Sequence, residues 1–197
     1  RNLESTQDET SCPFRCSWAG SRREKKTEKP DWAVESKFGN YQNAWKSLKA
    51  DFTSVYYLAT VTYDNDPVWG PNFTCLTVQA TSMSEPEKRI QAVFTYKDDH
   101  LQTRKSEENV FAVKMYDYNK ENAITYQTHK GNLTDVLAFS DGESCDIYYV
   151  PATEKNGEGY ELWVTNVKNI KPCCQFIFDY FTKDLKARKV YTEDCDK

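Results

Sequence analysis

The stretch CCQFIFDYF (residues 173–181) decides between two folds that the rest of the chain suits equally well. Many short strands could build either a β-sandwich or a barrel, because both need the same raw material. This stretch predicts a helix that can pack against a closed barrel. It therefore favours the barrel over the sandwich.

Eight strand-like runs precede that helix. The first, VYYLATVTY (55–63), is β-branched and aromatic, and the turn formers Asp64-Asn65-Asp66-Pro67 end it. The other seven runs are 73–80, 89–97, 109–118, 122–128, 134–140, 145–150 and 159–165. Eight consecutive antiparallel strands are the usual number for an up-and-down barrel that holds small ligands. We therefore expect an all-β, eight-stranded antiparallel barrel.

Helices should flank the strands at both ends. Tyr41, Trp45, Leu48 and Phe52 recur at spacings of four, three and four, which predicts an amphipathic helix over 40–52. We expect this N-terminal helix and the C-terminal helix to pack outside the barrel. A short strand over 187–192 should follow the C-terminal helix. Residues 1–30 are polar, and their mixed charges suit a solvated extension better than a basic binding patch. We expect this extension and one domain over 31–197.

Composition excludes several kinds of partner. No stretch approaches the roughly 18 apolar residues that cross a bilayer, so we expect no membrane partner. The formal net charge of −4 argues against a nucleic-acid partner. The chain carries 13 Tyr, 10 Phe and 5 Trp, whose rings suit an interior that must also meet a polar ligand.

Seven cysteines and two glycosylation sequons indicate an oxidising, extracellular setting. The sequons begin at Asn72 and Asn132. Cys12 and Cys16 have no downstream Cys/His pair to complete a zinc site, so we expect no metal. The chain begins at Arg1 without an apolar segment, and we interpret it as the mature form of a secreted protein.

The informative positions are acids that share a strand face with aromatic rings. Alternation puts Glu161 beside Trp163, and Asp146 beside Tyr148. On an outer face such acids would be ordinary surface residues. Inside the barrel, unpaired carboxylates would cost several kcal/mol unless a cation joined them, and a ring face would add cation–π attraction. Asp66 precedes Trp69 by three residues and repeats the pairing in a loop, where a simple Asp-Pro turn is the alternative.

An enzyme is the weaker interpretation. Asp146 and Glu161 could be the acid and base of a glycosidase, which needs an open cleft. No Ser/His/Asp arrangement or Gly-rich phosphate loop accompanies them. We therefore expect a binding protein that is not an enzyme and needs no cofactor.

At these residues the chain resembles the histamine-binding lipocalins of tick saliva, from about Pro30 to Cys195. The likeness consists of long, ordered matches rather than one short motif. The matching stretches include AWKSLKAD (44–51), NDPVWG (65–70), AVKMY (112–116), CD (145–146), YVP (149–151) and GYELW (159–163).

The resemblance implies a lipocalin barrel with two internal amine sites. One would use Asp66 and Glu108 as carboxylates, with Tyr63, Trp69 and Tyr126 as ring and hydroxyl partners. The second would use Asp51, Asp146 and Glu161, surrounded by Ser47, Tyr56 and Trp163. A carboxylate pair suits histamine, because one acid can pair with its amine while the other raises the pKa of its imidazole.

This chain departs from the family pattern at Ile124 and Leu133, and from the pattern of common lipocalins before Trp45. It carries Ile124 and Leu133 where relatives can carry Phe, so ring-stacking surface is lost and serotonin becomes a plausible second ligand. The Gly-x-Trp signature of common lipocalins is absent before Trp45, a divergence that is familiar in the tick group.

Two disulfides follow from the resemblance, Cys75–Cys195 and Cys145–Cys174, with Cys173 as an alternative to its neighbour. Cys12, Cys16 and Cys173 then remain, and three cysteines cannot all pair within one chain. Either Cys12–Cys16 closes a local loop while Cys173 stays free, or one of the three links a homodimer.

These features predict a secreted, high-affinity scavenger of histamine, and of serotonin as a second amine, that suppresses host inflammation. The alternative is a lipocalin that carries a fatty acid, eicosanoid or sterol, or that binds a host immune protein. An acid-rich interior speaks against an apolar cargo.

Overall fold

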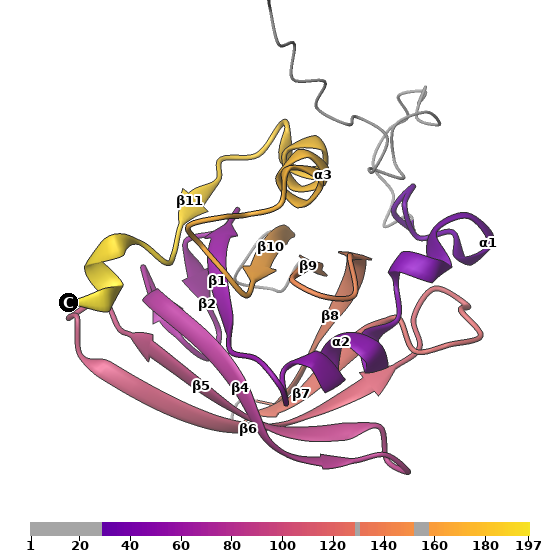
Figure 1. Ribbon diagram of the computed structural model, residues 1–197, viewed down its shortest axis with the longest axis horizontal. Coiled ribbons are helices and arrows are strands. Elements are labelled where there is room, and N and C mark those ends of the chain that lie inside the picture. Colours follow the sequence, from indigo (N-terminus) through magenta and orange to yellow (C-terminus); the bar gives the residue numbers. More distant parts are fainter. Residues whose placement is uncertain (1–28, 129–130, 152–157) are drawn as a thin grey trace, which may run out of the picture.

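A closed barrel of eight antiparallel strands forms the body of the protein in the computed structural model, which describes residues 29–128, 131–151 and 158–197 (Figure 1). Each strand pairs with the next, and the last pairs with the first. The strands are β1 (Tyr56–Val61), β4 (Thr74–Ser84), β5 (Arg89–Lys97), β6 (Thr103–Val113), β7 (Ala123–Thr128), β8 (Gly131–Ser140), β9 (Cys145–Val150) and β10 (Gly159–Val164). The expected barrel is confirmed.

Three shorter strands complete the β structure. β2 (Asn65–Asp66) and β3 (Gly70–Pro71) form a small antiparallel ribbon, whose tight return uses a positive φ of 83° at Gly70. β11 (Arg188–Lys189) pairs with Thr60 and Val61 of β1, on the edge of that strand opposite β10. The C-terminal strand is thus present but shorter than expected.

The N-terminal helical region is divided into short pieces, α1 (Glu35–Phe38), the 3-10 turn η2 (Gly39–Tyr41) and α2 (Ala44–Ala50). The side chain of Asn43 caps α2 by accepting from the backbone N–H of Lys46 at 2.9 Å. Trp45 and Leu48 of α2 belong to the core inside the barrel, so one face of this helix packs against the barrel interior (Figure 1). The predicted helix over 40–52 is therefore shorter, and Phe52 beyond its end is 45% exposed.

α3 (Pro172–Thr182) packs outside β9 and β10, as expected for a helix on a closed barrel (Figure 1). A last 3-10 turn, η3 (Glu193–Asp196), carries Cys195. Among the described residues, no helix is long and apolar enough to cross a membrane.

β6 differs most from its predicted bounds of 109–118. It starts six residues earlier, at Thr103, because residues 103–107 pair with β5 although most of their side chains are exposed. Backbone pairing does not require apolar side chains where a barrel wall faces water. It ends at Val113, and Tyr116 and Asp117 beyond it adopt positive φ angles that leave the strand.

Two apolar layers stabilise the molecule. One fills the barrel and includes Leu58, Phe94 and Trp163. The other lies between the barrel wall and its outer cover, where Leu162 and Val164 of β10 meet Ile177 and Phe178 of α3. Alternation along β10 therefore sends Glu161 and Trp163 inward and Leu162 and Val164 outward.

Both expected disulfides, Cys75–Cys195 and Cys145–Cys174, are present. Cys173 is also disulfide-bonded, so the expectations of a free Cys173 and of a chain-linking Cys173 are wrong. Cys174 faces the barrel on the buried side of α3, which explains why it pairs with Cys145 in place of Cys173. Cys12 and Cys16 lie outside the described residues, as does nearly all of the expected 1–30 extension.

Candidate functional site

Two internal cavities lie at different levels of the barrel. The first, which we call the β2–β3 cavity, measures about 50 Å³ and lies under the ribbon that contains Asp66. The second, the α2 cavity, measures about 30 Å³ and is bounded by Ser47 and Leu48 of α2. Both exceed the roughly 10–15 Å³ that one buried water needs, so each can hold small polar groups.

Four buried carboxylates line the β2–β3 cavity: Asp66, Glu108, Asp135 and Glu161. They come from four different strands, β2, β6, β8 and β10, whose inward positions meet at this level of the barrel. Aromatic side chains lie among them, namely Tyr63, Trp69, Phe94 and Tyr126.

Hydrogen bonds fix each of these acids. Asp66 Oδ1 accepts from the backbone N–H groups of Val68 at 2.6 Å and Trp69 at 2.9 Å. Glu108 Oε1 accepts from Ser106 Oγ at 2.7 Å. Asp135 and Glu161 accept hydrogen bonds from aromatic side chains. These bonds hold the aromatic rings beside the carboxylates.

Glu161 accepts a hydrogen bond at each of its carboxylate oxygens. Its two carboxylate oxygens accept from the hydroxyl of Tyr63 and from the indole Nε1 of Trp163, the latter at 2.7 Å. Burial and the Asp66 carboxylate raise the pKa of Glu161 to about 7, although these two hydrogen bonds lower it. At neutral pH this acid is therefore divided between its charged and protonated forms.

Asp135 faces the same cavity from β8. Burial and the charge of Glu161 raise the pKa of its carboxyl well above the ordinary range, while a hydrogen bond from Tyr126 opposes the rise. An acid whose pKa is raised by a neighbouring carboxylate, in a place screened from water, favours a cation beside it.

The α2 cavity contains a second pair of acids, Asp51 at the end of α2 and Asp146 on β9. Ser47 Oγ donates to Asp146 Oδ2 at 2.6 Å and lies 2.8 Å from the hydroxyl of Tyr148. Burial raises the pKa of Asp146 to about 6, and burial with the Asp146 charge raises that of Asp51 well above its ordinary value. Tyr56 and Trp163 complete the aromatic wall.

A partition of aromatic rings separates the cavities. Phe94 and Tyr126 line both of them, with their ring centroids 6.1 Å apart. Trp163 lines the α2 cavity and donates its hydrogen bond across to Glu161. None of the described residues that line either cavity is Lys, Arg or His. The described lining of both cavities thus offers rings and carboxylates without a basic side chain.

Residues 32–197 match the family model described as tick histamine binding protein. This chain belongs to the tick histamine-binding protein family. It is 43% identical to "Female-specific histamine-binding protein 1" of Rhipicephalus appendiculatus over 172 residues, covering 86% of this chain and 90% of that protein. It is 42% identical over 178 residues to the "Male-specific histamine-binding salivary protein" of the same tick, covering 85% and 88%.

Solved structures with a similar fold are lipocalins of low sequence identity. Apocrustacyanin C2 has a TM-score of 0.54 at 10% identity, covering 74% of this chain and 81% of that one. Japanin from Rhipicephalus appendiculatus, solved with cholesterol, has a TM-score of 0.52 at 14% identity, covering 74% and 97%. These likenesses confirm the lipocalin barrel of this family member and nothing about its ligand.

One grouping expected from the family resemblance needs correction. Glu161 was placed with Asp51 and Asp146, but it lines the β2–β3 cavity with Asp66 and Glu108. The register explains the difference, because β10 sets Trp163 opposite Asp146 and Glu161 opposite Tyr148. Two residues of strand advance about 7 Å, which carries Glu161 from the level of one cavity to that of the other.

The remaining expected residues lie where the resemblance grouped them. Tyr63, Asp66, Trp69, Glu108 and Tyr126 line the β2–β3 cavity, and Ser47, Asp51, Tyr56, Asp146 and Trp163 line the α2 cavity. The two departures from the family pattern are divided between the cavities, with Leu133 in the first and Ile124 in the second.

Sequence reasoning missed Asp135 and Tyr148. Alternation along β8 puts Asp135 on the same face as Leu133 and Leu137, so an acid between two inward leucines was a readable signal. Tyr148 was recognised only as a neighbour of Asp146, although it contacts Ser47 inside the α2 cavity.

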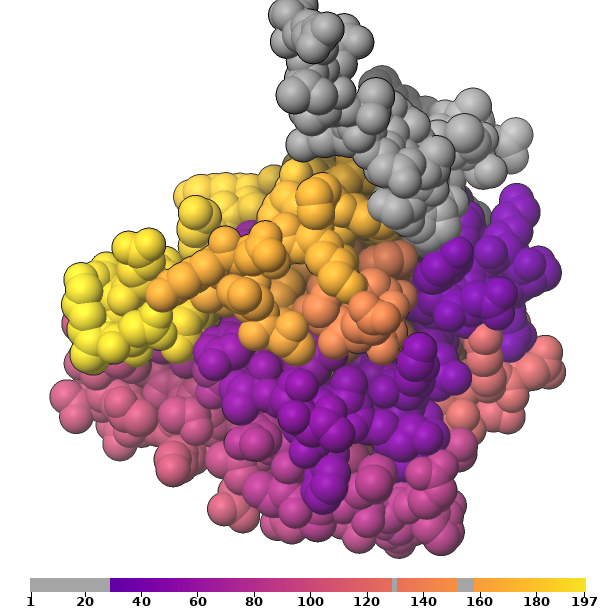
Figure 2. Space-filling view, viewed as in Figure 1, coloured from indigo at the N-terminus to yellow at the C-terminus, as the bar shows by residue number. Residues whose placement is uncertain are grey.

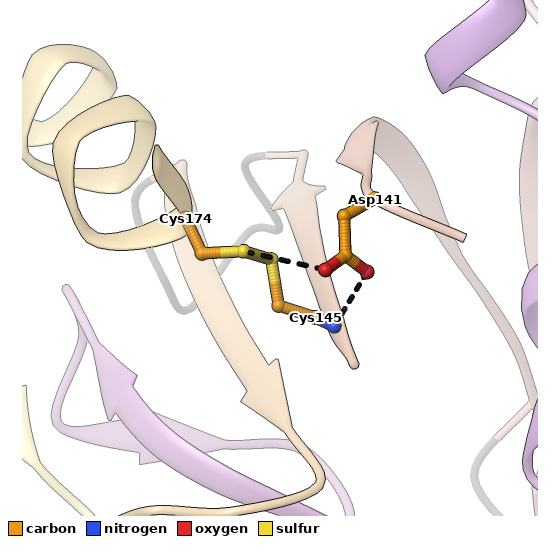
Figure 3. A group of neighbouring side chains, drawn as sticks. All are labelled: Asp141, Cys145 and Cys174. Carbon is orange, nitrogen blue, oxygen red and sulfur yellow. Dashed lines mark hydrogen bonds between the residues drawn. A yellow bond between two sulfur atoms is a disulfide. The ribbon is translucent and has the colours of Figure 1, made fainter. Parts of the chain in front are cut away.

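Asp141, Cys145 and Cys174 form a cluster with the spacing of metal ligands, outside both cavities (Figure 3). The two sulfur atoms are joined in a disulfide and therefore cannot act as thiolate ligands. Asp141 instead accepts backbone N–H groups from Glu143, Ser144 and Cys145 and a bond of 2.9 Å from Lys171. This cluster anchors the start of α3 and has no metal-binding character.

Proposed function

We propose that this protein is a secreted, high-affinity scavenger of histamine, and of serotonin as a second amine, which suppresses host inflammation by removing the free amine. The observation that carries the proposal is the set of six buried carboxylates in two cavities whose described lining includes no basic residue. Such acids favour a bound cation, because the cation repays the cost of burying them.

The site residues divide into two proposed amine sites. In the β2–β3 cavity, Asp66, Glu108, Asp135 and Glu161 would neutralise the cation, while Tyr63, Trp69 and Tyr126 would contact its ring. Trp69 Nε1 is buried and has no hydrogen-bond partner among the described residues, so a ligand acceptor atom would satisfy it. In the α2 cavity, Asp51 and Asp146 would take the charge, with Ser47, Tyr56, Tyr148 and Trp163 around it.

Leu133 and Ile124 shape the choice of amine. Each replaces a flat ring surface with a branched aliphatic side chain in its cavity, so the outline of both proposed sites changes. Serotonin is larger than histamine and also carries one amine and an aromatic ring. We propose it as the second ligand on this ground.

Secretion is supported by the disulfides and by the name of one relative, which identifies it as a salivary protein. Asn72 and Asn132 are both exposed, so both sequons are accessible for glycosylation. We propose simple binding without catalysis, since hydrogen bonds hold the acids of both cavities in place.

A hydrophobic cargo is the second candidate, since Japanin shares the fold and was solved with cholesterol. An apolar ligand in these cavities would leave the carboxylates buried and unpaired, which costs free energy. A protein partner on the outside of the barrel would leave the cavity acids unexplained. Both alternatives account for fewer observations than amine binding does.

Isothermal titration at pH 7.5 with histamine, serotonin, arachidonate and cholesterol distinguishes these ligands. We expect sub-micromolar binding of histamine, measurable binding of serotonin, and no heat from either lipid. If the lipids bind and neither amine does, the scavenger proposal fails.

A further inference from the structure

The outer face of α3 carries an apolar stripe next to a bonded cysteine. Cys173, Phe176 and Tyr180 are three and four positions apart, so they lie on one side of the helix. Phe176 is 53% exposed and Tyr180 is 39% exposed, and α3 lies at the surface of the molecule (Figure 2). The opposite side of α3, with Cys174, Ile177 and Phe178, is buried on the barrel.

The cysteines leave few partners for Cys173. The chain has seven, and the disulfides Cys75–Cys195 and Cys145–Cys174 use four of them. Cys173 is disulfide-bonded as well. The structure consists of a single chain, and within it the remaining cysteines are Cys12 and Cys16.

We propose that the N-terminal segment 12–18 docks on the outer face of α3, fastened by a disulfide between Cys173 and one of Cys12 and Cys16. This segment reads CPFRCSW. Phe14 lies two residues along the chain from either cysteine, so either bond would bring its ring within reach of the stripe. Trp18 adds a second ring, which suits a stripe that presents Phe176 and Tyr180.

The bond needs no chemistry beyond that of the other two disulfides. Two thiols lose two protons and two electrons to a disulfide oxidant through thiol–disulfide exchange. Three disulfides then use six of the seven cysteines, so one thiol of the extension remains. The extension becomes a strap on one barrel, fastened on a helix that lines neither cavity.

Non-reducing peptide mapping of the full-length protein tests the bond directly. Free thiols are alkylated before digestion, and the fragment that contains Cys173 and Cys174 is isolated. We expect it to carry both the Cys145 peptide and a peptide with Cys12 or Cys16. An alkylated Cys173, or a Cys173 joined to a second chain, would overturn the proposal.

Hydroxyl-radical footprinting tests the docking separately, by comparing the full chain with Cys173→Ser. This variant keeps the Cys145–Cys174 disulfide, and circular dichroism checks that it is folded. We expect oxidation of Phe176 and Tyr180 to rise in the variant, while Phe52, which is exposed elsewhere, stays unchanged. Equal oxidation of the stripe in both proteins would show that the segment does not cover α3.

Discussion

The indole of Trp163 donates a 2.7 Å hydrogen bond from Nε1 to Oε2 of Glu161, two residues earlier on β10. The ring of Trp163 lines the α2 cavity, whereas the carboxylate of Glu161 lines the β2–β3 cavity. One strand thus places a wall of one proposed amine site in contact with an acid of the other. The acidity of Glu161 is therefore central to how both cavities respond to charge.

The stability of the unliganded protein should fall as the pH rises toward 7. The pKa of Glu161 is about 7 in the folded chain and near 4.5 when exposed, so between these values the folded state binds the extra proton. Stability is greatest below the lower value and is lost as the pH rises through the upper one. Melting temperatures from pH 5 to 7.5 should fall less steeply for Glu161→Gln than for the wild type.

The matched control is Glu107→Gln, which makes the same change at an exposed position of β6. It should retain the wild-type slope of melting temperature against pH. Parallel slopes for Glu161→Gln and the wild type would show that Glu161 does not hold its proton in the folded barrel.

Amine binding should release protons near neutral pH. A cation favours the charged forms of Glu161 and Asp146, whose pKa values of about 7 and about 6 fall when it binds. Affinity should accordingly decline from about pH 7 downward, well before the pH 4–5 expected for ordinary carboxylates. Titration of histamine at pH 6.5 in two buffers of different ionisation enthalpy measures the protons released, and identical heats would contradict the account.

Asp135→Asn should weaken one site and stabilise the empty protein. The substitution removes the buried carboxyl of Asp135, whose pKa is raised by burial and by the Glu161 charge, so repulsion between these two acids is lost. We expect histamine affinity at that cavity to drop by about 1–3 kcal/mol, and unfolding in urea at pH 7.5 to require more denaturant. Asp99→Asn, an exposed substitution, should change neither quantity.

Asp141→Ala should destabilise the fold and spare the amine sites. Its carboxylate accepts the backbone N–H groups of the 141–145 turn and the Lys171 side chain at the start of α3. Loss of these hydrogen bonds should lower the free energy of unfolding, measured in urea, by about 1–3 kcal/mol. The matched change at an exposed position, Asp184→Ala, should lower it little. If the Asp141 variant also lost its histamine stoichiometry, the cluster would have a role beyond anchoring α3.

The sequence predicted the barrel well because alternation is a local signal. The inward faces of β9 and β10 were readable from residues such as Asp146 and Trp163. Register was not readable, because the level at which Glu161 meets its neighbours depends on the pairing of β9 with β10. The polar start of β6 was missed for a related reason, since pairing with β5 extends it beyond its apolar residues.

Two further features depend on long-range contacts. The sequence left Cys173 and Cys174 as alternatives, and the choice follows from which side of α3 faces the barrel. The number of acids in the β2–β3 cavity depends on strand pairing, which sets β8 and β10 on the two sides of β9 and brings Asp135 near Glu161. Neither follows from spacing along the chain.

The stoichiometry of histamine binding in matched variants tests the central claim most directly. Glu108→Gln and Asp146→Asn each remove one charge and keep the shape, and each alters one cavity only. Calorimetry at pH 7.5 should give two sites per wild-type chain and one remaining site in each variant, with the altered site weakened by about 2–5 kcal/mol. Abolition of all binding by either substitution, or unchanged binding in both, would contradict two separate amine sites built on buried carboxylates.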